Sequence, residues 1–460
     1  MIKIFNHYFH ARTVSSIFFD FLLLTSLFLI SIKFNLTKLS NLSEDFILTI
    51  TCLTFGILII NSGLGFYEKV NKKTTREIKI RGLLALCLSL GLAFMTLNYL
   101  QINVGDERNL IIALIASVVM MLSHRLYAFH EAHKGFLRQR ILVYGSGKTA
   151  LGVGEKLLDY DSSVDLVGYY TGLKEREINN KKEKFLSTHK TLTQHVREQK
   201  VDEIIVALSE RRGGSMPMRE LLDCKLNGIR VVDMAHHFEK KMGKISLDYV
   251  SAGHLIFSEG FKQGMFRRFF KRLFDIVFSV ILIILALPVL MISGILILIE
   301  SGWPLIYCQE RVGLNGKLFN VYKLRSMKRD AEEKDKPVWA LLHDNRITGV
   351  GRIIRKFRID ELPQLFSVLT GKMSLVGPRP ERNFFVQKLI QELPFYAVRQ
   401  SVKPGLTGWA QVRYHYGSTV EDAAEKLQYD LYYVKNNSVF LDFVVLFETV
   451  GVVLTGKGSH

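Results

Sequence analysis

Cysteine is scarce in this sequence, with four residues in a chain of 460. Cys52, Cys87, Cys224 and Cys308 show neither the paired spacing of a disulfide framework nor that of a zinc site. Acidic residues are also few, because 43 Asp and Glu stand against 61 Lys and Arg, giving a net charge of +18. Together with a 48% share of apolar residues, this excess favours an anionic membrane surface over nucleic acid as the partner.

Charges are nearly absent from four apolar segments near the N-terminus, which span about residues 14–32, 46–66, 83–100 and 110–126. Each is near the length of about 20 residues that crosses a bilayer, and no cleavage site follows the first. We therefore expect a retained four-helix transmembrane bundle over residues 1–130. Cations after the second and fourth segments predict that both ends of the bundle face the cytoplasm. Asp20, inside the first segment, is interpreted as a polar contact between helices rather than as part of a transport path.

A glycine-rich turn follows a short buried strand at residues 140–144. Gly145 and Gly147 begin a G-x-G-x-x-A pattern, a turn whose backbone can approach a nucleotide phosphate at a helix N-terminus. A bound nucleotide and a purely structural turn are both compatible with this pattern. Further apolar strand candidates alternate with polar helical stretches and lie at 166–170, 204–208 and 229–232. The alternation predicts a small Rossmann-like parallel α/β domain at 138–255.

A fifth apolar run covers residues 273–299 and is interrupted by Pro288. At 1.5 Å per residue it is long enough to cross a bilayer outright, which would place the last 160 residues outside the cell. Proline removes a backbone hydrogen bond and favours a bend, so a run that enters and leaves the membrane from one face is the alternative. The residues alone leave both alternatives open. Lys271, Arg272 and Asp275 precede the break and are expected at the membrane interface.

The stretch from Arg346 to Pro380 combines a basic helix with a pair of acids. Its cations precede any acid and are Arg346, Arg352, Arg355, Lys356 and Arg358. Apolar residues at helical spacing between them are Val350, Ile353, Ile354 and Phe357. This pattern predicts a helix that lies in a membrane interface with its cations at headgroup level. Two adjacent carboxylates, Asp360 and Glu361, follow and suit chemistry on a phosphate-bearing substrate.

From about residue 271 to the end, several motifs occur in a characteristic order. They are KRLFD at 271–275, YCQERVGLNGKLFNVYKLRSM at 307–327, DELPQ at 360–364, SLVGPRP at 374–380, VKPGLTGWAQV at 402–412 and YDLYYVKN at 429–436. This part of the chain resembles the bacterial polyprenyl-phosphate sugar-1-phosphate transferases. With the N-terminal spans and the G-x-G-x-x-A domain, the chain is similar to the long forms that initiate exopolysaccharide or O-antigen repeat units.

The resemblance implies a reaction that moves a sugar 1-phosphate from a UDP-sugar to undecaprenyl phosphate and releases UMP. It implies Asp360 as the nucleophile, through a covalent aspartyl intermediate, and Glu361 as a ligand of Mg²⁺. Because two anions repel, cations are needed around the phosphates, and the candidates are Lys323, Arg325, Arg358 and Arg379.

The resemblance also implies a membrane architecture for the second half of the chain. A re-entrant membrane helix at 264–300 would break at Pro288, where Leu287 replaces the serine that is common in the family. A monotopic, mostly α-helical catalytic domain at 301–460 would follow and face the cytoplasm at the bacterial inner membrane. The expected partners are undecaprenyl phosphate, a UDP-sugar, anionic lipids and a second copy in a homodimer, with no nucleic acid.

Two other function classes fit parts of the sequence. A membrane-anchored nucleotide-sugar dehydratase would need a Tyr-x-x-x-Lys pair, and Tyr170 with Lys174 lies too near the glycine-rich turn. A lipid-bound scaffold would fit the basic surface and would not depend on Asp360. Acids outside the motif chemistry are interpreted as solvated and without a chemical role, namely Asp202, Glu203, Glu421, Asp422 and Asp430.

Overall fold

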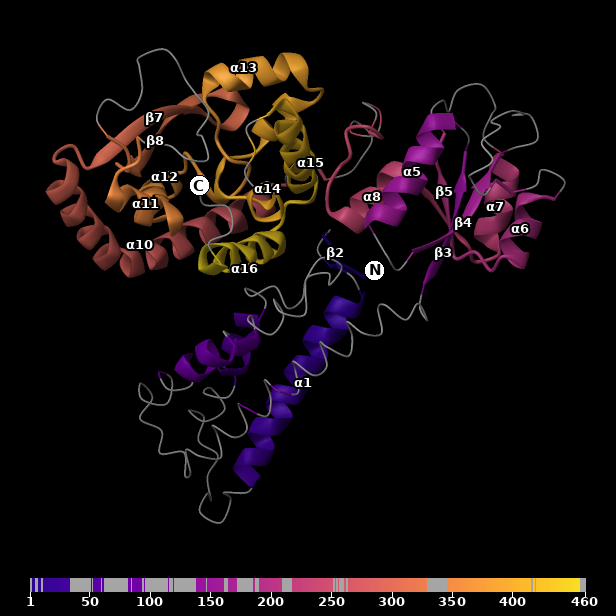
Figure 1. Cartoon of the computed structure of the whole chain (residues 1–460), viewed down its shortest axis with the longest axis horizontal. Helices are drawn as coiled ribbons and strands as arrows, with labels where there is room; N and C mark the ends of the chain where they lie inside the picture. Colours follow the sequence, from indigo (N-terminus) through magenta and orange to yellow (C-terminus); the bar gives the residue numbers. More distant parts are fainter. Residues whose placement is uncertain are drawn as a thin grey trace. The chain divides into compact units, whose positions relative to one another are not determined.

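The computed structural model of the chain describes most of its second half and parts of its first (Figure 1). The described residues are 2–4, 7–9, 11–33, isolated residues between 51 and 119, 138–145, 147–160, 164–171, 185–186, 190–208, 217–250, a few residues between 253 and 261, 264–328, 346–414, 417 and 419–455. They divide into two compact units. One takes in the chain from residue 243 onward with residues up to 21 and those at 51–61, and the other takes in the remainder up to residue 242.

The N-terminus begins with an antiparallel hairpin of β1 (Ile2–Ile4) and β2 (His7–Phe9), which leads into α1 (Ala11–Lys33). The first predicted apolar segment is therefore a helix, and Asp20 is buried in it. The other three predicted spans are described only in part, and residues 53–58 and 85–92 in two of them are helical. The four-helix bundle stays a prediction.

A four-stranded parallel sheet organises the middle of the chain, with strand order β4-β3-β5-β6. The strands are β3 (Gln139–Tyr144), β4 (Val164–Tyr170), β5 (Glu203–Val206) and β6 (Arg230–Asp233). The helices are α5 (Gly147–Tyr160), α6 (Leu192–Glu198), α7 (Met218–Leu226) and α8 (Met234–Met242). The predicted alternation of strands and helices is thus confirmed.

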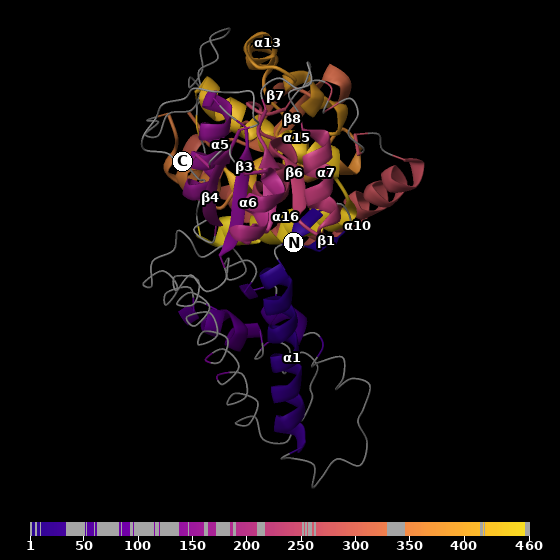
Figure 2. The ribbon, with the colours of Figure 1, turned by 90° about the vertical axis from the view of Figure 1, so that its right-hand side faces the viewer.

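Helices cover both faces of this sheet. Figure 1 shows α5 and α8 on one side and α6 with α7 on the other, and Figure 2 looks at the sheet through α6 and α7. Leu142 and Ile204 of the sheet pack against Leu192 of α6 and Leu221 of α7. Because both faces are covered, the strands need apolar residues on both sides, which explains their continuous Ile-Leu-Val runs.

The second half of the chain is mostly helical. The α-helices described there are α10 (Met265–Ser301), α11 (Gly349–Lys356), α12 (Gln364–Leu369), α13 (Asn383–Glu392), α14 (Trp409–Arg413), α15 (Val420–Asn436) and α16 (Val439–Thr455). Short 3-10 turns are η2 (Leu314–Gly316), η3 (Ile359–Glu361) and η4 (Tyr396–Ser401). The strands β7 (Ile306–Val312) and β8 (Leu318–Leu324) form an antiparallel hairpin, and β9 (Ser374–Val376) and β10 (Gly405–Thr407) form a parallel pair. The core packs Leu431 and Tyr432 of α15 against Leu365 of α12 and Leu375 of β9.

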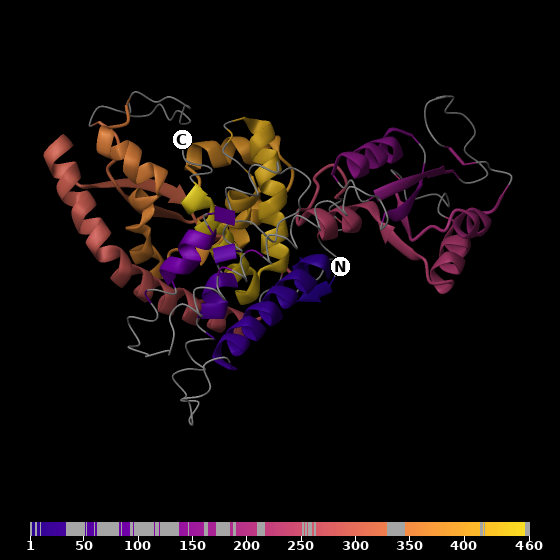
Figure 3. The same ribbon diagram turned by 60° about the horizontal axis from the view of Figure 1, so that its bottom comes forward.

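Within the described residues, α10 is the one helix long and apolar enough to cross a membrane. Its most apolar window has a mean hydropathy of 3.1, and only 22% of that window is buried, unlike the core helix of a soluble protein. The helix continues through Pro288 without a break. Figures 1 and 3 show it curving along the side of the unit that carries α11 and α12.

Both ends of α10 are fastened to the same unit. Near its start, Asp275 accepts hydrogen bonds from the Ser374 hydroxyl and from the backbone N–H of Leu375, at 3.0 and 3.1 Å. Arg272 donates to the carbonyls of Val368 and Leu369 at the end of α12. Near its finish, Glu300 accepts from the first backbone N–H groups of α11, at 2.7 and 2.9 Å.

Candidate active site

The two adjacent carboxylates lie on η3, the short 3-10 turn between α11 and α12. Arg358, just before the turn, has φ 55°, a left-handed conformation that a residue with a long side chain rarely adopts. Pro363 then enters α12 with φ −58°. Asp360 and Glu361 are 8% and 7% exposed, so both carboxylates are largely withdrawn from water. Backbone strain of this kind persists only where the surroundings hold it and is frequent at functional sites.

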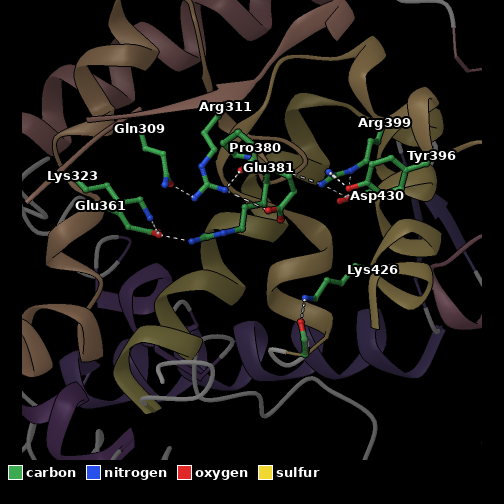
Figure 4. A network of polar contacts seen from close by, with 12 residues as sticks. Gln309, Arg311, Lys323, Glu361, Pro380, Glu381, Tyr396, Arg399, Lys426 and Asp430 are labelled. Atoms are coloured by element: carbon green, nitrogen blue, oxygen red, sulfur yellow. Dashed lines mark hydrogen bonds and ion pairs between the residues drawn. The ribbon is translucent and has the colours of Figure 1, made fainter. Parts of the chain in front are cut away.

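Glu361 is surrounded by three of the four cations expected around the phosphates, and Figure 4 shows one of them, Lys323, beside it. Lys323 of β8 donates to its Oε1 at 2.9 Å, and Arg379 donates to the same oxygen at 2.7 Å. Arg358 lies 3.8 Å from its Oε2. The structure therefore brings together residues that are 56 positions apart in the sequence.

The neighbouring Asp360 is in a different electrostatic state. Burial, followed by the charge of Glu361, raises the pKa of Asp360 to about 6. Burial alone would raise the pKa of Glu361 as well, but Arg379, Lys323 and Arg358 hold it well below its usual value. Within the described part of the chain, no residue donates a hydrogen bond to the Asp360 carboxylate. Asp360 is thus the more basic of the two carboxylates, and no donor among the described residues occupies its oxygens.

The loop that carries Arg379 is fixed by a close crossing of two backbones. A Cβ on Gly377 would lie 2.4 Å from the Lys403 carbonyl oxygen, and one on Gly408 would lie 2.2 Å from that of Gly377. Gly377 donates a backbone hydrogen bond to Thr407, and Gly405 donates one to Pro378, both at 2.9 Å. Only glycine allows two chains to approach this closely, which explains the glycines of the SLVGPRP and VKPGLTG motifs.

Behind this loop lies an ion pair that the sequence interpretation missed. Asp430 of α15 is 2% exposed and pairs with Arg399 of η4, so interpreting it as a solvated acid was wrong. The sequence signal for its burial was its place in the YDLYYVKN motif. It also lies between Leu427 and Leu431, which are both buried. Asp422 is also engaged, because it caps α15 with Thr419 and accepts from the Tyr414 hydroxyl at 2.8 Å.

Arg325, the fourth predicted phosphate-binding cation, lies at another place. Its guanidinium donates to the Ser301 carbonyl at 2.7 Å and to the Gly302 carbonyl, at the C-terminal end of α10. Lys271, Arg272 and Asp275 likewise contact protein groups. Lys271 pairs with Asp442 at 2.7 Å, and the contacts of the other two are those given above for the start of α10. These four residues fasten the apolar helix to the unit that holds the carboxylates.

The basic helix is divided between core and surface. Ile354 is buried and packs with Ile297 of α10 and Leu324 of β8, and Val350 lies against the same cluster. Ile353 and Phe357, by contrast, are exposed. About half of the predicted apolar stripe therefore packs in the core, and the other half is available to a membrane surface.

The glycine-rich turn of the α/β unit has a packing reason of its own. A Cβ on Gly145 would lie 2.4 Å from the carbonyl oxygen of Ala207, at the end of the neighbouring strand. Gly147, at φ 77°, begins α5 and has open space around it. The first glycine is therefore explained by strand packing, and nucleotide binding stays a prediction.

Glu203, interpreted as a solvated strand start, is in fact buried. Its Oε1 lies 2.5 Å from Nδ1 of His237 on α8, and Gln139 donates to its Oε2 at 2.8 Å. The His237 pairing and the Gln139 hydrogen bond lower the pKa of Glu203 against the opposing effect of burial. Asp202 remains exposed and accepts from the backbone N–H of Arg140.

The two carboxylates fit a magnesium ion only if the substrate supplies further ligands to it. Across the described ranges, no group of three or more His, Cys, Asp or Glu side chains gathers around a common point. Mg²⁺ usually takes one or two protein carboxylates and completes its shell with substrate phosphates and water. Asp360 and Glu361 meet that requirement.

The sequence comparisons agree with the motifs around this site. The family model described as bacterial sugar transferase matches residues 266–456. A UDP-N-acetylgalactosamine-undecaprenyl-phosphate N-acetylgalactosaminephosphotransferase of Aeromonas hydrophila is 44% identical over 173 residues, which are 38% of this chain and 41% of that protein. A UDP-glucose:undecaprenyl-phosphate glucose-1-phosphate transferase of Escherichia coli (strain K12) is 40% identical over 182 residues, 39% of each chain.

This chain thus spans about two fifths of the length of those two relatives. A shorter relative, the uncharacterized sugar transferase EpsL of Bacillus subtilis (strain 168), is 43% identical over 164 residues. That match takes in 35% of this chain and 75% of the relative. Because a relative is matched over most of its length and the motifs converge on one buried site, the chain belongs to the bacterial sugar transferase family.

Proposed function

We propose that this protein transfers a sugar 1-phosphate from a UDP-sugar to undecaprenyl phosphate and releases UMP. Family membership supports the proposal, and so do the names of the relatives, several of which are undecaprenyl-phosphate sugar phosphotransferases. The product would be the lipid-linked first sugar of an exopolysaccharide or O-antigen repeat unit.

One observation carries the proposal, namely the unlike states of the two adjacent carboxylates. Glu361 is held by Lys323 and Arg379 and keeps its charge. Asp360 accepts no hydrogen bond from the described residues and has a pKa of about 6. At neutral pH it is therefore ionised, yet more nucleophilic than an ordinary carboxylate.

The reaction would proceed in two displacements at one phosphorus. In the first, an oxygen of Asp360 attacks the sugar-bearing phosphorus, the bond to the bridging oxygen breaks, and UMP leaves with the electron pair. In the second, an oxygen of undecaprenyl phosphate attacks the same phosphorus, and the acyl phosphate bond to Asp360 breaks. The carboxylate is regenerated and the phospho-sugar is now on the lipid.

The cations near the pair would keep these anions together. Lys323, Arg358 and Arg379 lie within 4 Å of Glu361, so their charges would lie beside the incoming phosphates. Mg²⁺, held by Glu361 and Asp360 together with substrate, would supply further neutralisation of the diphosphate. Charge balance is the main requirement, because phosphoryl transfer depends on positioning and electrostatics more than on covalent chemistry.

The fastening of α10 supports a re-entrant membrane helix over a spanning one. A straight helix of 37 residues is about 55 Å long, so its ends would lie on opposite sides of a bilayer. Here the first third bonds to α12 and β9, and the last residues bond to α11 and to Arg325, which follows β8 in the same unit. We therefore propose that α10 enters and leaves the cytoplasmic leaflet of the inner membrane.

The exposed apolar side chains support the same placement. Between its fastened ends α10 presents a continuous exposed apolar surface, including Leu285, Met291 and Ile292. Ile353 and Phe357 of α11 add to it next to the basic residues of that helix. Such a combination favours an interface with anionic headgroups. Binding at that interface would bring the carboxylate pair close to the phosphate of the lipid substrate.

The test is UMP release by the full-length protein in membranes, measured with undecaprenyl phosphate and a panel of UDP-glucose, UDP-galactose, UDP-N-acetylglucosamine and UDP-N-acetylgalactosamine. Asp360→Asn should lower the rate with the active donor by roughly a thousandfold or more. Glu421→Gln, at an exposed position of α15, is the matched control and should keep the wild-type rate. Full turnover by Asp360→Asn would reject the mechanism and favour a scaffold role.

A further inference from the structure

The ion pair behind the active site has a contact pattern that suits a positioning role. The Arg399 guanidinium donates through Nε to Asp430 Oδ2 at 2.8 Å, and a second nitrogen lies at the same distance from that oxygen. It also donates to the Tyr396 hydroxyl at 3.0 Å. Its last contact is a hydrogen bond of 2.9 Å to the backbone carbonyl of Arg379. Figure 4 shows Arg399 with Tyr396 and Asp430.

A continuous series of contacts thus joins α15 to the carboxylate pair. Asp430 holds Arg399, Arg399 holds the backbone of Arg379, and the Arg379 side chain holds Glu361. The carbonyl that accepts from Arg399 belongs to the residue whose guanidinium reaches the site. The orientation of Arg379 therefore depends on a contact that lies on its far side.

The surroundings of Arg399 indicate that this geometry is specific. A buried ion pair is weak evidence for stability, because desolvation offsets most of the attraction. The planar fork of arginine can serve a carboxylate, a hydroxyl and a carbonyl at once, which a lysine cannot do. Phe395, which precedes η4, has φ 63°, the same left-handed region as Arg358 before η3. Both turns that carry this series of contacts therefore begin at a strained residue that is not glycine.

We propose that Arg399 and Asp430 are positioning residues, which hold Arg379 on Glu361 and so keep the carboxylate pair arranged for phosphoryl transfer. The proposal rests on the proposed function, and it adds two residues to the site. Neither residue reaches the carboxylates itself, and both act through Arg379. A misplacement of about 1 Å at a phosphate-binding group is enough to slow an enzyme by about a hundredfold.

The first test is hydrogen exchange measured by mass spectrometry on the full-length protein in lipid nanodiscs. Arg399→Lys keeps a cation beside Asp430 and loses the bond to the Arg379 carbonyl. We expect amide exchange in residues 377–382 to become at least several times faster. Glu425→Gln is the matched control, because Glu425 lies on the same helix and pairs with Lys244, away from Arg379. It should leave exchange in residues 377–382 unchanged.

The second test is a double-mutant cycle on UMP release. Arg399→Lys should lower kcat about tenfold or more, with less than a threefold change in KM for the UDP-sugar. In an Arg379→Lys background the same change should lower kcat less than threefold, because the group that Arg399 positions is already altered. Arg399→Lys should lower the melting temperature equally in both backgrounds. An unequal loss of kcat with an equal loss of stability would show that the effect on kcat comes from positioning and not from folding.

Each outcome bears on the proposal. Unchanged exchange at residues 377–382, or equal losses of kcat in both backgrounds, would overturn it. If Arg399→Lys does not accumulate in membranes, the pair Arg399→Gln with Asp430→Asn removes both charges together and leaves none buried alone. The same predictions apply to it. Turnover by Asp360→Asn would reject the proposed function, whereas a dead Asp360→Asn with an unaffected Arg399→Lys would reject the positioning role alone.

Discussion

Asp360 and Glu361 are neighbours in the chain and equally buried, yet they meet different charges. Glu361 contacts Lys323 and Arg379, whereas the charges of those cations act on Asp360 only from a longer distance. A buried carboxylate without a close partner prefers its neutral form, because water no longer solvates the charge. The ionised Asp360 is therefore a strained group at neutral pH, which gives it both reactivity and an effect on stability.

Asp360→Asn should make the protein more stable while it removes activity. A pKa raised from 3.8 to about 6 means that folding favours the protonated acid. Its ionisation therefore destabilises the fold by roughly 3 kcal/mol above about pH 6, and this destabilisation is absent below about pH 4. The asparagine has no charge to lose, so we expect its melting temperature to exceed that of the wild type by a few degrees at pH 7.5.

The measurement is thermal unfolding in detergent with a metal chelator present, at pH 7.5 and at pH 4.5. The difference between the two proteins should shrink at the lower pH, where the wild-type acid is largely protonated. Glu421→Gln serves as the control and should match the wild type at both pH values. A variant that is less stable than the wild type at pH 7.5 would contradict a raised pKa at Asp360.

Among the elements, α11 connects the apolar helix to the carboxylate pair. Its first N–H groups bond to Glu300 at the end of α10, and its last turn leads through Arg358 into η3. The free N–H groups at a helix start bind a carboxylate well, because the helix dipole adds to the hydrogen bonds. The position of η3 thus depends on where α10 ends.

Glu300→Gln should loosen this connection. Glu300 uses one oxygen for each of the two N–H groups, and the glutamine has only one acceptor oxygen, so the start of α11 should lose about 1 kcal/mol of stabilisation. We expect faster amide exchange in residues 349–352 and a lower rate of UMP release. Glu310→Gln, on the exposed side of β7, provides the comparison. Unaltered exchange at the start of α11 would show that Glu300 does not fix it.

The positions of helices and strands could be predicted from the sequence where a single hydrophobic pattern extends over the whole segment. The parallel strands of the α/β unit and the long apolar helix were predicted because apolar runs between turns have few alternatives. The convergence of Lys323 and Arg379 on Glu361 was expected from motif resemblance and not from spacing, because contacts across 38 residues leave no local pattern. The burial of Asp430 and Glu203 was missed, since their partners Arg399 and His237 come from distant elements.

At the scale of the whole molecule, the proposed topology places all soluble parts on one side of the membrane. A protease-cleavable tag at the C-terminus should be cut in inside-out membrane vesicles and protected in intact spheroplasts. The physical reason is that both ends of α10 bond to one compact unit, which cannot lie on two sides of a bilayer. Cleavage in spheroplasts would instead show that α10 crosses the membrane.

The strand β8 has a consequence for how this enzyme would respond to its lipid surroundings. Lys323 and Arg325 are two residues apart, so about 7 Å of extended chain separates a contact with Glu361 from a contact with the end of α10. A bilayer that is thinner or thicker than usual would shift that helix end, and the strand would carry the shift to the carboxylates. Catalytic rate should therefore vary with acyl-chain length even when the concentrations of both substrates are held constant.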